Sequence, residues 1–371
     1  MMDLVPLLEA RRDRPNEQAA LVTVVEVIGS AFRRPGARML VFEDGSWQGA
    51  VSSGCLESDL AERARRVIAT GDPELADYEL GDMEEPVWGL GMGCPGNVRA
   101  LLTPFGDEDI GLLTELEDPQ QEGILVTLFA LREEKDWRAP SAVERWQKHI
   151  PLPLPEKAVP FPDSAAESLH EVIAGIGGRS EAQVVEVEWE GGIGKVLLEH
   201  IRPHPRLLIH GAGPGSAVLA ALGNTLGWKV TVADHRPDRL QPAAFPDTRL
   251  VICHDVANEV PALDHPDRTA VVVMTHHWER DRALLERYLP DRPRYLGLMS
   301  SRSRRDDLLE ELSEEQRVRT EGILHSPMGL DLGAERPEEM ALATAAEIQA
   351  VLRDASGGRL RDREGPVHRR D

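Results

Sequence analysis

The spacing of apolar residues changes along the chain and predicts where strands and helices lie. Residues 21–28 form a dense run of branched apolar side chains, which is typical of a buried strand. From Leu56 onward, apolar residues recur every three to four positions, so an amphipathic helix is predicted to begin at about Cys55. Gly54 is then the expected N-cap, and Glu57 follows it by three residues, as in half of a capping box.

Residues 1–203 combine short strand patterns with hairpin and glycine-rich turns. Strand-like runs at 38–42, 47–51 and 123–131 are separated by few helices, so a largely antiparallel α+β domain is expected. Six prolines between residues 135 and 163 predict an irregular, partly extended segment.

The pattern changes after residue 203. Residues 204–355 alternate short apolar strands with helices, which predicts a parallel, doubly wound sheet. Residues 356–371 have no apolar pattern and are predicted to form a disordered tail. The expected fold class is α/β, with an N-terminal α+β domain followed by a C-terminal Rossmann-like domain.

A glycine loop opens the first βαβ unit of the C-terminal domain. Gly211, Gly213 and Gly215 follow an apolar strand and precede a helix, and Asp234 ends the next strand. In dinucleotide-binding folds, such glycines let the backbone approach a pyrophosphate, and such an acid holds ribose hydroxyls. Pro214 removes one backbone donor, so the sequence leaves NAD(P) binding open.

Other candidates follow later strands of the same sheet, because ligands of such sheets bind beyond the carboxyl ends of the strands. His276 and His277 follow one strand, and Arg302 opens a helix beside two serines. Arg302 suits an anion, with a plain surface role as the alternative. Either histidine would serve as the acid–base group of an NAD(P)-dependent oxidoreductase, or as a hydrogen-bonded structural group.

Two of the three cysteines stand beside glycines. Cys55 lies at the predicted helix start, where N–H groups and the helix dipole favour a thiolate or an anionic ligand group. Cys94 lies in a loop, residues 88–97, that contains four glycines before a strand. The alternative for each is a small residue in a tight turn.

Composition excludes several classes of function. A formal net charge of −22 argues against a nucleic-acid surface. No segment approaches the ~20 apolar residues of a membrane span, and no signal peptide is recognised at the N-terminus. Three cysteines do not make a secreted disulfide framework, so a cytoplasmic protein is expected.

The motifs taken together resemble a known family, the xanthine dehydrogenase accessory proteins, which include the carbon monoxide dehydrogenase maturation factors. The chain departs from the usual pattern at Ser53, Pro95 and Pro214. The segments that carry the resemblance are SGCLE at 53–57, GCPG at 93–96, GAG at 211–213, YLGLMSSR at 295–302 and HSPMGLDLGA at 325–334.

The resemblance implies a maturation chaperone that turns over no substrate itself. Family members bind the molybdenum cofactor, a phosphorylated pterin dithiolene, protect it during sulfuration and pass it to an apo molybdenum hydroxylase. A cysteine desulfurase is the implied sulfur donor, and a homodimer is expected.

The resemblance also implies a ranking of the candidate residues. Cys55 is the first candidate, as a soft metal ligand, and Cys94 is the second. An NAD(P)-dependent oxidoreductase is the alternative function, and a docking platform is a third possibility for the C-terminal domain. The remaining cofactor-binding candidates are Gly54, Glu57, Gly211, Gly213, Gly215, Asp234, His276 and Arg302.

Overall fold

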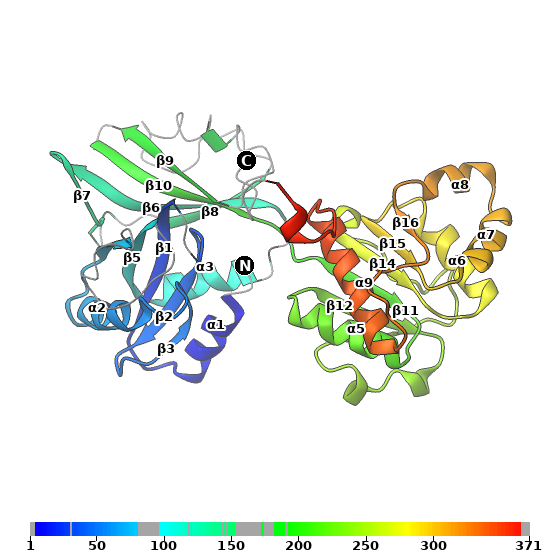
Figure 1. The fold of residues 1–371 in the computed structure, drawn as a ribbon. Helices are drawn as coiled ribbons and strands as arrows, with labels where there is room; N and C mark the ends of the chain where they lie inside the picture. The colour runs from blue at the N-terminus through cyan, green and yellow to red at the C-terminus, as the bar shows by residue number, and fades with distance from the viewer. Residues whose placement is uncertain are drawn as a thin grey trace. The chain divides into compact units, whose positions relative to one another are not determined.

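The chain forms two compact units, which are described separately below. One unit runs to Pro203 and the other begins at His204 (Figure 1). We call them the N-terminal unit and the C-terminal unit. The computed structural model describes residues 4–29, 32–80, 96–117, 119, 121–141, 144, 147–152, 172–173, 182–189 and 192–364.

The N-terminal unit contains a five-stranded antiparallel sheet in the order β3-β2-β1-β5-β4. β1 is buried over its first seven residues because both faces of the sheet are covered. The strands are β1 (Ala19–Gly29), β2 (Arg38–Phe42), β3 (Trp47–Gly49), β4 (Glu74–Leu80) and β5 (Gly96–Phe105).

A second antiparallel sheet has the order β7-β6-β10-β9, with β8 also paired to β6. β7 and β8 lie inside residues 135–163, which the proline content predicted to be irregular. The described prolines permit these strands, because Pro140 lies between them and Pro151 is the last residue of β8. The strands are β6 (Gly123–Glu133), β7 (Asp136–Arg138), β8 (Gln147–Pro151), β9 (Ala182–Trp189) and β10 (Gly192–Ile201).

Helices α1 (Leu4–Asp13), α2 (Glu57–Thr70) and α3 (Asp107–Glu117) add to the layers in the described part of the N-terminal unit. Leu60 and Ala64 of α2 pack with Val22 of β1 on one face of the first sheet. On the other face, neighbouring residues of β1 pack against α1, α3 and the second sheet. The unit is therefore layered helix, sheet, sheet around β1.

The two sheets of the N-terminal unit also share a buried ion pair. Arg38 of β2 donates two hydrogen bonds to Glu199 of β10, at 3.0 and 2.6 Å. Gly36 passes so close that a Cβ there would stand 2.5 Å from Glu199 Oε1.

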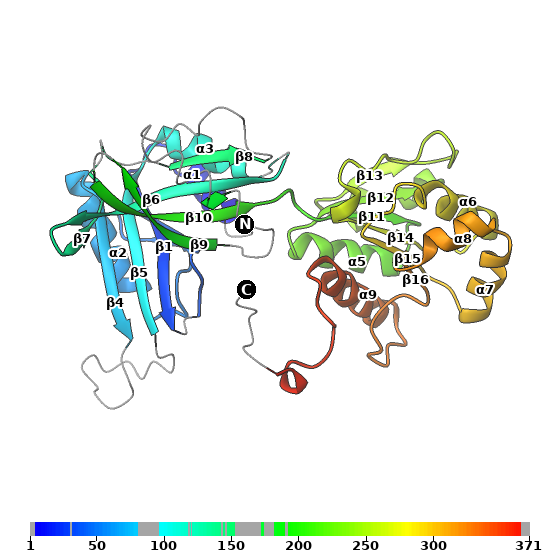
Figure 2. The same cartoon turned by 90° about the horizontal axis from the view of Figure 1, so that it is seen from above.

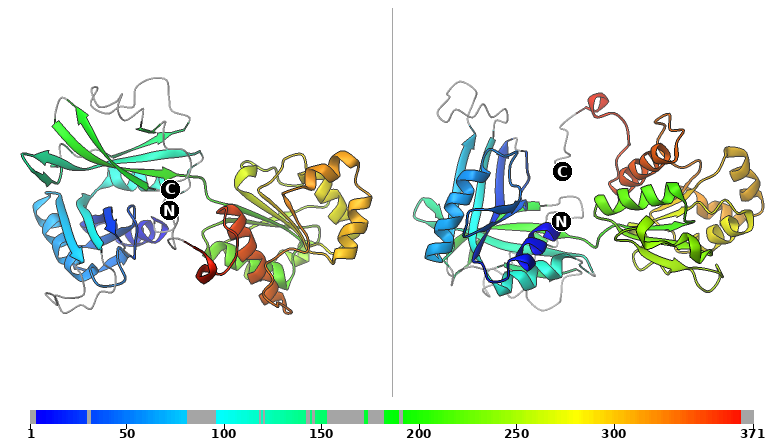
Figure 3. Two further views of the ribbon diagram at one scale, coloured as in Figure 1. Left: turned by 45° about the horizontal axis from the view of Figure 1, so that its top comes forward. Right: turned by 90° about the horizontal axis from the view of Figure 1, so that it is seen from below.

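The C-terminal unit is a doubly wound parallel sheet in the order β13-β12-β11-β14-β15-β16. α5 and α9 pack together on one face, and α6 and α7 cover the other. Figure 3 shows the orange-red α9 beside the green α5. The predicted fold class is confirmed. The strands are β11 (Arg206–His210), β12 (Lys229–Asp234), β13 (Arg249–Ile252), β14 (Thr269–Val273), β15 (Tyr295–Leu298) and β16 (Leu324–His325).

The helices of the C-terminal unit include several short ones. A 3-10 turn, Leu360–Asp362, lies inside the tail that was predicted to be disordered, where Gly357 also approaches Leu330. No helix among the described residues is long and apolar enough to cross a membrane. The helices are α5 (Pro214–Thr225), α6 (Trp278–Tyr288), α7 (Arg302–Glu310), α8 (Glu314–Thr320) and α9 (Pro337–Leu352), with 3-10 turns at Pro237–Arg239, Pro242–Ala244 and Pro266–Arg268.

Candidate functional site

Several strand ends of the first N-terminal sheet meet at one edge. Gly29, the last residue of β1, pairs with Gly96 at the start of β5, and Leu80 at the end of β4 also pairs with Gly96. Figure 2 shows the ends of β1 and β4 beside the start of β5. The Cys55 turn lies near this edge, because Cys55 packs against the same apolar cluster as Val27 of β1 and Tyr78 of β4.

Cys94 lies outside the described residues. The two described residues that flank its segment, Leu80 and Gly96, form a pair with each other. These two residues thus lie at the sheet edge near the Cys55 turn.

A serine hydroxyl organises the Cys55 turn. The backbone N–H groups of Gly54, Cys55 and Leu56 all donate to Ser52 Oγ, each at 3.1 Å. The Ser52 hydroxyl in turn donates to the Glu57 carboxylate. The turn is therefore closed around one side chain.

Glu57 anchors this network from the first position of α2. Its Oε1 atom accepts from the N–H groups of Val51, at 3.1 Å, and Ser52, at 2.7 Å. Burial alone raises the pKa of Glu57, but the hydrogen bonds from Ser52 and the backbone outweigh it and lower the pKa below its usual value. A buried, ionised carboxylate thus holds the turn.

Two details of the predicted helix start are wrong. The N-cap is Leu56 rather than Gly54, and α2 begins at Glu57, so Cys55 precedes the helix. The backbone N–H groups expected to face a thiolate are directed at Ser52 Oγ instead. Gly54 has φ +107°, a conformation that favours glycine.

The Cys55 thiol itself is half-buried and forms no disulfide. Its Sγ atom donates to Ser52 Oγ at 3.4 Å and lies 4.0 Å from Ser53 Oγ. Ser52 was not predicted as a site residue; the available signal was a serine three residues before the cysteine and five before a glutamate. Among the described residues, no three His, Cys, Asp or Glu side chains are placed to hold a metal ion.

The glycine loop of the C-terminal unit lies at the carboxyl end of β11, as predicted. Gly211 has φ +114°, and a Cβ there would stand 2.5 Å from the Met274 carbonyl oxygen. Gly213 is the extended N-cap of α5. A Cβ on Gly215 would make ordinary contacts with Met274 and Pro337. Of these three positions, only position 211 has a backbone conformation that requires glycine.

Asp234 lies beside this loop with a side chain that is 1% exposed. It accepts from the Ala212 N–H at 2.7 Å and from the Arg236 backbone and guanidinium at 2.8–2.9 Å. Burial opposes ionisation, but the Arg236 guanidinium and the two N–H groups lower the pKa of Asp234 to about 2.

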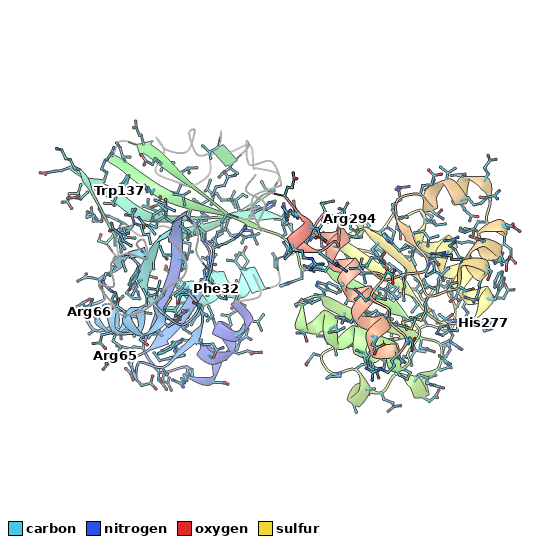
Figure 4. All side chains as sticks on the ribbon, viewed as in Figure 1. Phe32, Arg65, Arg66, Trp137, His277 and Arg294 are labelled. Atoms are coloured by element: carbon cyan, nitrogen blue, oxygen red, sulfur yellow. The ribbon has the colours of Figure 1, made fainter. Side chains whose placement is uncertain are left out.

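The remaining predicted residues do not converge on one point. His276 and His277 are exposed, His276 with φ +59°, and Figure 4 labels His277 on the outside of the unit. Arg302 is exposed at the start of α7. Arg304, two positions later, was not predicted; it donates to the fully buried Asp281 at 2.8 Å.

An antiparallel α+β unit with a thiol-bearing turn, followed by a Rossmann-like unit, defines a two-domain class of protein. Residues 13–79 match the XdhC and CoxI family, and residues 207–348 match the XdhC Rossmann domain. The chain belongs to this family, which confirms the resemblance noted in the sequence.

Relatives match over most of the chain. A Bacillus subtilis protein, named as a probable subunit of xanthine dehydrogenase, is 28% identical over 90% of this chain and 92% of its own length. The molybdenum cofactor insertion chaperone PaoD of Escherichia coli is 26% identical over 90% of this chain and 83% of its own. A crystal structure from Bacillus halodurans, described as a xanthine dehydrogenase, superposes with a TM-score of 0.72 at 26% identity, covering 95% of this chain and 96% of that one.

Proposed function

We propose that this protein is a maturation factor that binds the molybdenum cofactor through Cys55 and delivers it to an apo molybdenum hydroxylase. The observation that carries the proposal is the accessible Cys55 thiol in a turn whose shape is fixed by Ser52 and Glu57. Membership of the XdhC and CoxI family and similarity to a molybdenum cofactor insertion chaperone support it.

The single thiol ligand of the turn suits a cofactor that already contains its metal. The described residues near Cys55 offer one soft sulfur ligand and no complete ligand set. A molybdenum centre already held by its dithiolene needs only such an additional ligand. On binding, the thiol proton that Cys55 donates to Ser52 would be released to solvent, because the thiolate is the metal-binding form.

The finer parts of the proposal concern the steps around binding. The protein holds the cofactor while a cysteine desulfurase supplies the sulfur ligand, acts in the cytoplasm as a homodimer, and turns over no substrate alone. Cys94 is proposed as a second thiol at the site, because the described residues that flank its segment, Leu80 and Gly96, pair at the sheet edge near the Cys55 turn.

Cofactor binding tests the proposal directly. Molybdenum cofactor released from a molybdenum hydroxylase is mixed with the full chain, and bound molybdenum is measured after gel filtration. We expect one cofactor per chain, and a loss of at least about tenfold in affinity for Cys55→Ala, which corresponds to about 1.4 kcal/mol.

Two variants serve as matched controls for that measurement. Ser53→Ala changes an exposed neighbour, and Cys253→Ala removes a buried thiol of the C-terminal unit. Both should bind like the parent. Parent-like binding by Cys55→Ala would show that the site assignment is wrong, whereas no binding by the parent would remove the proposed function.

A further inference from the structure

The first four positions of the glycine loop, residues 211–214, offer no free backbone donor. The Gly211 N–H donates to the Ala233 carbonyl at 2.9 Å, and the Ala212 N–H donates to Asp234 at 2.7 Å. The Gly213 N–H donates to Ser216 Oγ at 2.6 Å, and Pro214 has no N–H. Four consecutive positions therefore offer no hydrogen to a pyrophosphate, which such loops bind through their N–H groups.

The acid at the end of β12 is occupied as well. A carboxylate has about four acceptor sites. Asp234 accepts four hydrogen bonds: one from Ala212, one from the Arg236 N–H and two from the Arg236 guanidinium. With its side chain 1% exposed, it has neither surface nor acceptor sites left for the ribose hydroxyls that this position holds in dinucleotide-binding folds.

On the side of Gly215, atoms of the protein lie beside the loop, whereas a Cβ on Gly213 would meet nothing within 4 Å. In open α/β sheets the ligand lies at the switch point of the strand order, here between β11 and β14. Met274, which follows β14 and is 8% exposed, extends its methyl group to 3.5 Å from the position of a Cβ on Gly215. Pro337, the first residue of α9, lies at 3.8 Å from the same position.

From these three observations we infer that the glycine loop does not bind NAD(P) or related dinucleotides. We also infer that the hydrogen bonds of Asp234 stabilise the conformation of the loop. The residues present do not fit the cofactor that the Rossmann fold implies. The loop has the backbone path of a dinucleotide-binding site. Its N–H groups, however, donate to Asp234 and Ser216 and stabilise the turn between β11 and α5.

Nucleotide titration of the full chain tests the first part of the inference. NADH and NADPH are added to about 1 mM while nicotinamide fluorescence and the melting temperature are followed. We expect no saturable change in fluorescence and no rise in melting temperature, because a ligand that binds only the folded state must stabilise it. Saturable binding of either nucleotide at one per chain would overturn the inference.

Two further measurements test whether Asp234 stabilises the loop. Asp234→Asn should lower the melting temperature by several degrees, whereas Asp238→Asn, an exposed acid in the next turn, should leave it unchanged. An unchanged melting temperature for Asp234→Asn would show that Asp234 does not stabilise the loop. If that variant does not fold, hydrogen exchange of the parent decides: slow exchange at Ala212 and Gly213 is expected, and rapid exchange at both would contradict the closed loop. None of these readouts involves Cys55, so they are independent of the proposed function.

Discussion

Ser52 fixes the shape of the Cys55 turn by hydrogen bonds, although it is not proposed to contact the cofactor. Its oxygen accepts three backbone N–H groups and its hydroxyl hydrogen goes to Glu57. The sequence located the turn but misplaced the N-cap, because capping rules assume that the residue next to the helix supplies the acceptor. Here the acceptor comes from four residues before the true N-cap, Leu56, and only the folded backbone brings it there.

Glu57 should make a pH-dependent contribution to stability. Its folded pKa lies below the ordinary value of 4.5, so it stabilises the fold above pH 4.5, and that contribution is lost as the pH falls through the folded pKa. Glu57→Gln presents an amide to the Ser52 hydroxyl, which already receives three backbone N–H donors and the Cys55 thiol. We expect this substitution to lower the free energy of unfolding by about 1–3 kcal/mol at pH 7.

Urea unfolding at pH 7 and pH 4 measures this effect. The difference between parent and Glu57→Gln should be smaller at pH 4. Glu62→Gln, in an exposed position on the same helix, is the control and should change little at either pH. A difference that grows towards pH 4 would contradict the assigned role.

Among the elements, the β11–loop–α5–β12 unit is the part that the sequence predicted most completely. The strand, the glycines, the helix and the acid all lie where the pattern placed them. The occupancy of the donors could not be predicted, because the partners of Ala212 and Gly213 are Asp234 and Ser216, side chains for which the fingerprint assigns other roles or none. In this chain, the glycine fingerprint therefore predicts the path of the backbone but does not establish that a dinucleotide binds there.

The glycines of this loop should differ in their tolerance of substitution. Gly211→Ala combines a left-handed φ with a contact to the Met274 carbonyl, so we expect at least about 2 kcal/mol of destabilisation. Gly213 is extended and faces open space, so Gly213→Ala should cost less than about 1 kcal/mol. Chemical unfolding of both variants checks the order; equal losses would show that the loop is distorted as a whole.

At the scale of the whole molecule, the cores of the two units are separate. The buried apolar clusters of the described residues lie entirely before residue 202 or entirely after residue 206. The change of hydrophobic pattern near residue 203 made the two fold types predictable. The pairing of the two N-terminal sheets through Arg38 and Glu199 was not predictable, because these residues are 161 positions apart and neither stands in a distinctive motif.

Separate cores predict that the C-terminal unit folds without the N-terminal unit. A fragment of residues 204–364 should give parallel α/β circular dichroism and a cooperative thermal transition. A fragment ending at residue 336 lacks α9, and with it Ala341, Ala345 and Ile348 of the core, so it should lose that transition. An unfolded 204–364 fragment would show that its stability depends on the rest of the chain.

The frame around Cys55 has a practical consequence for protein engineering. The turn is held by the Ser52 side chain, the Glu57 side chain and the backbone, while the Cys55 side chain contributes one long hydrogen bond. Because Cys55 is half-buried and packs against an apolar cluster, selenocysteine, which has nearly the same size, is the replacement that the scaffold should accept most readily. This replacement would change the donor atom at position 55 while leaving the hydrogen bonds of Ser52 and Glu57 in place.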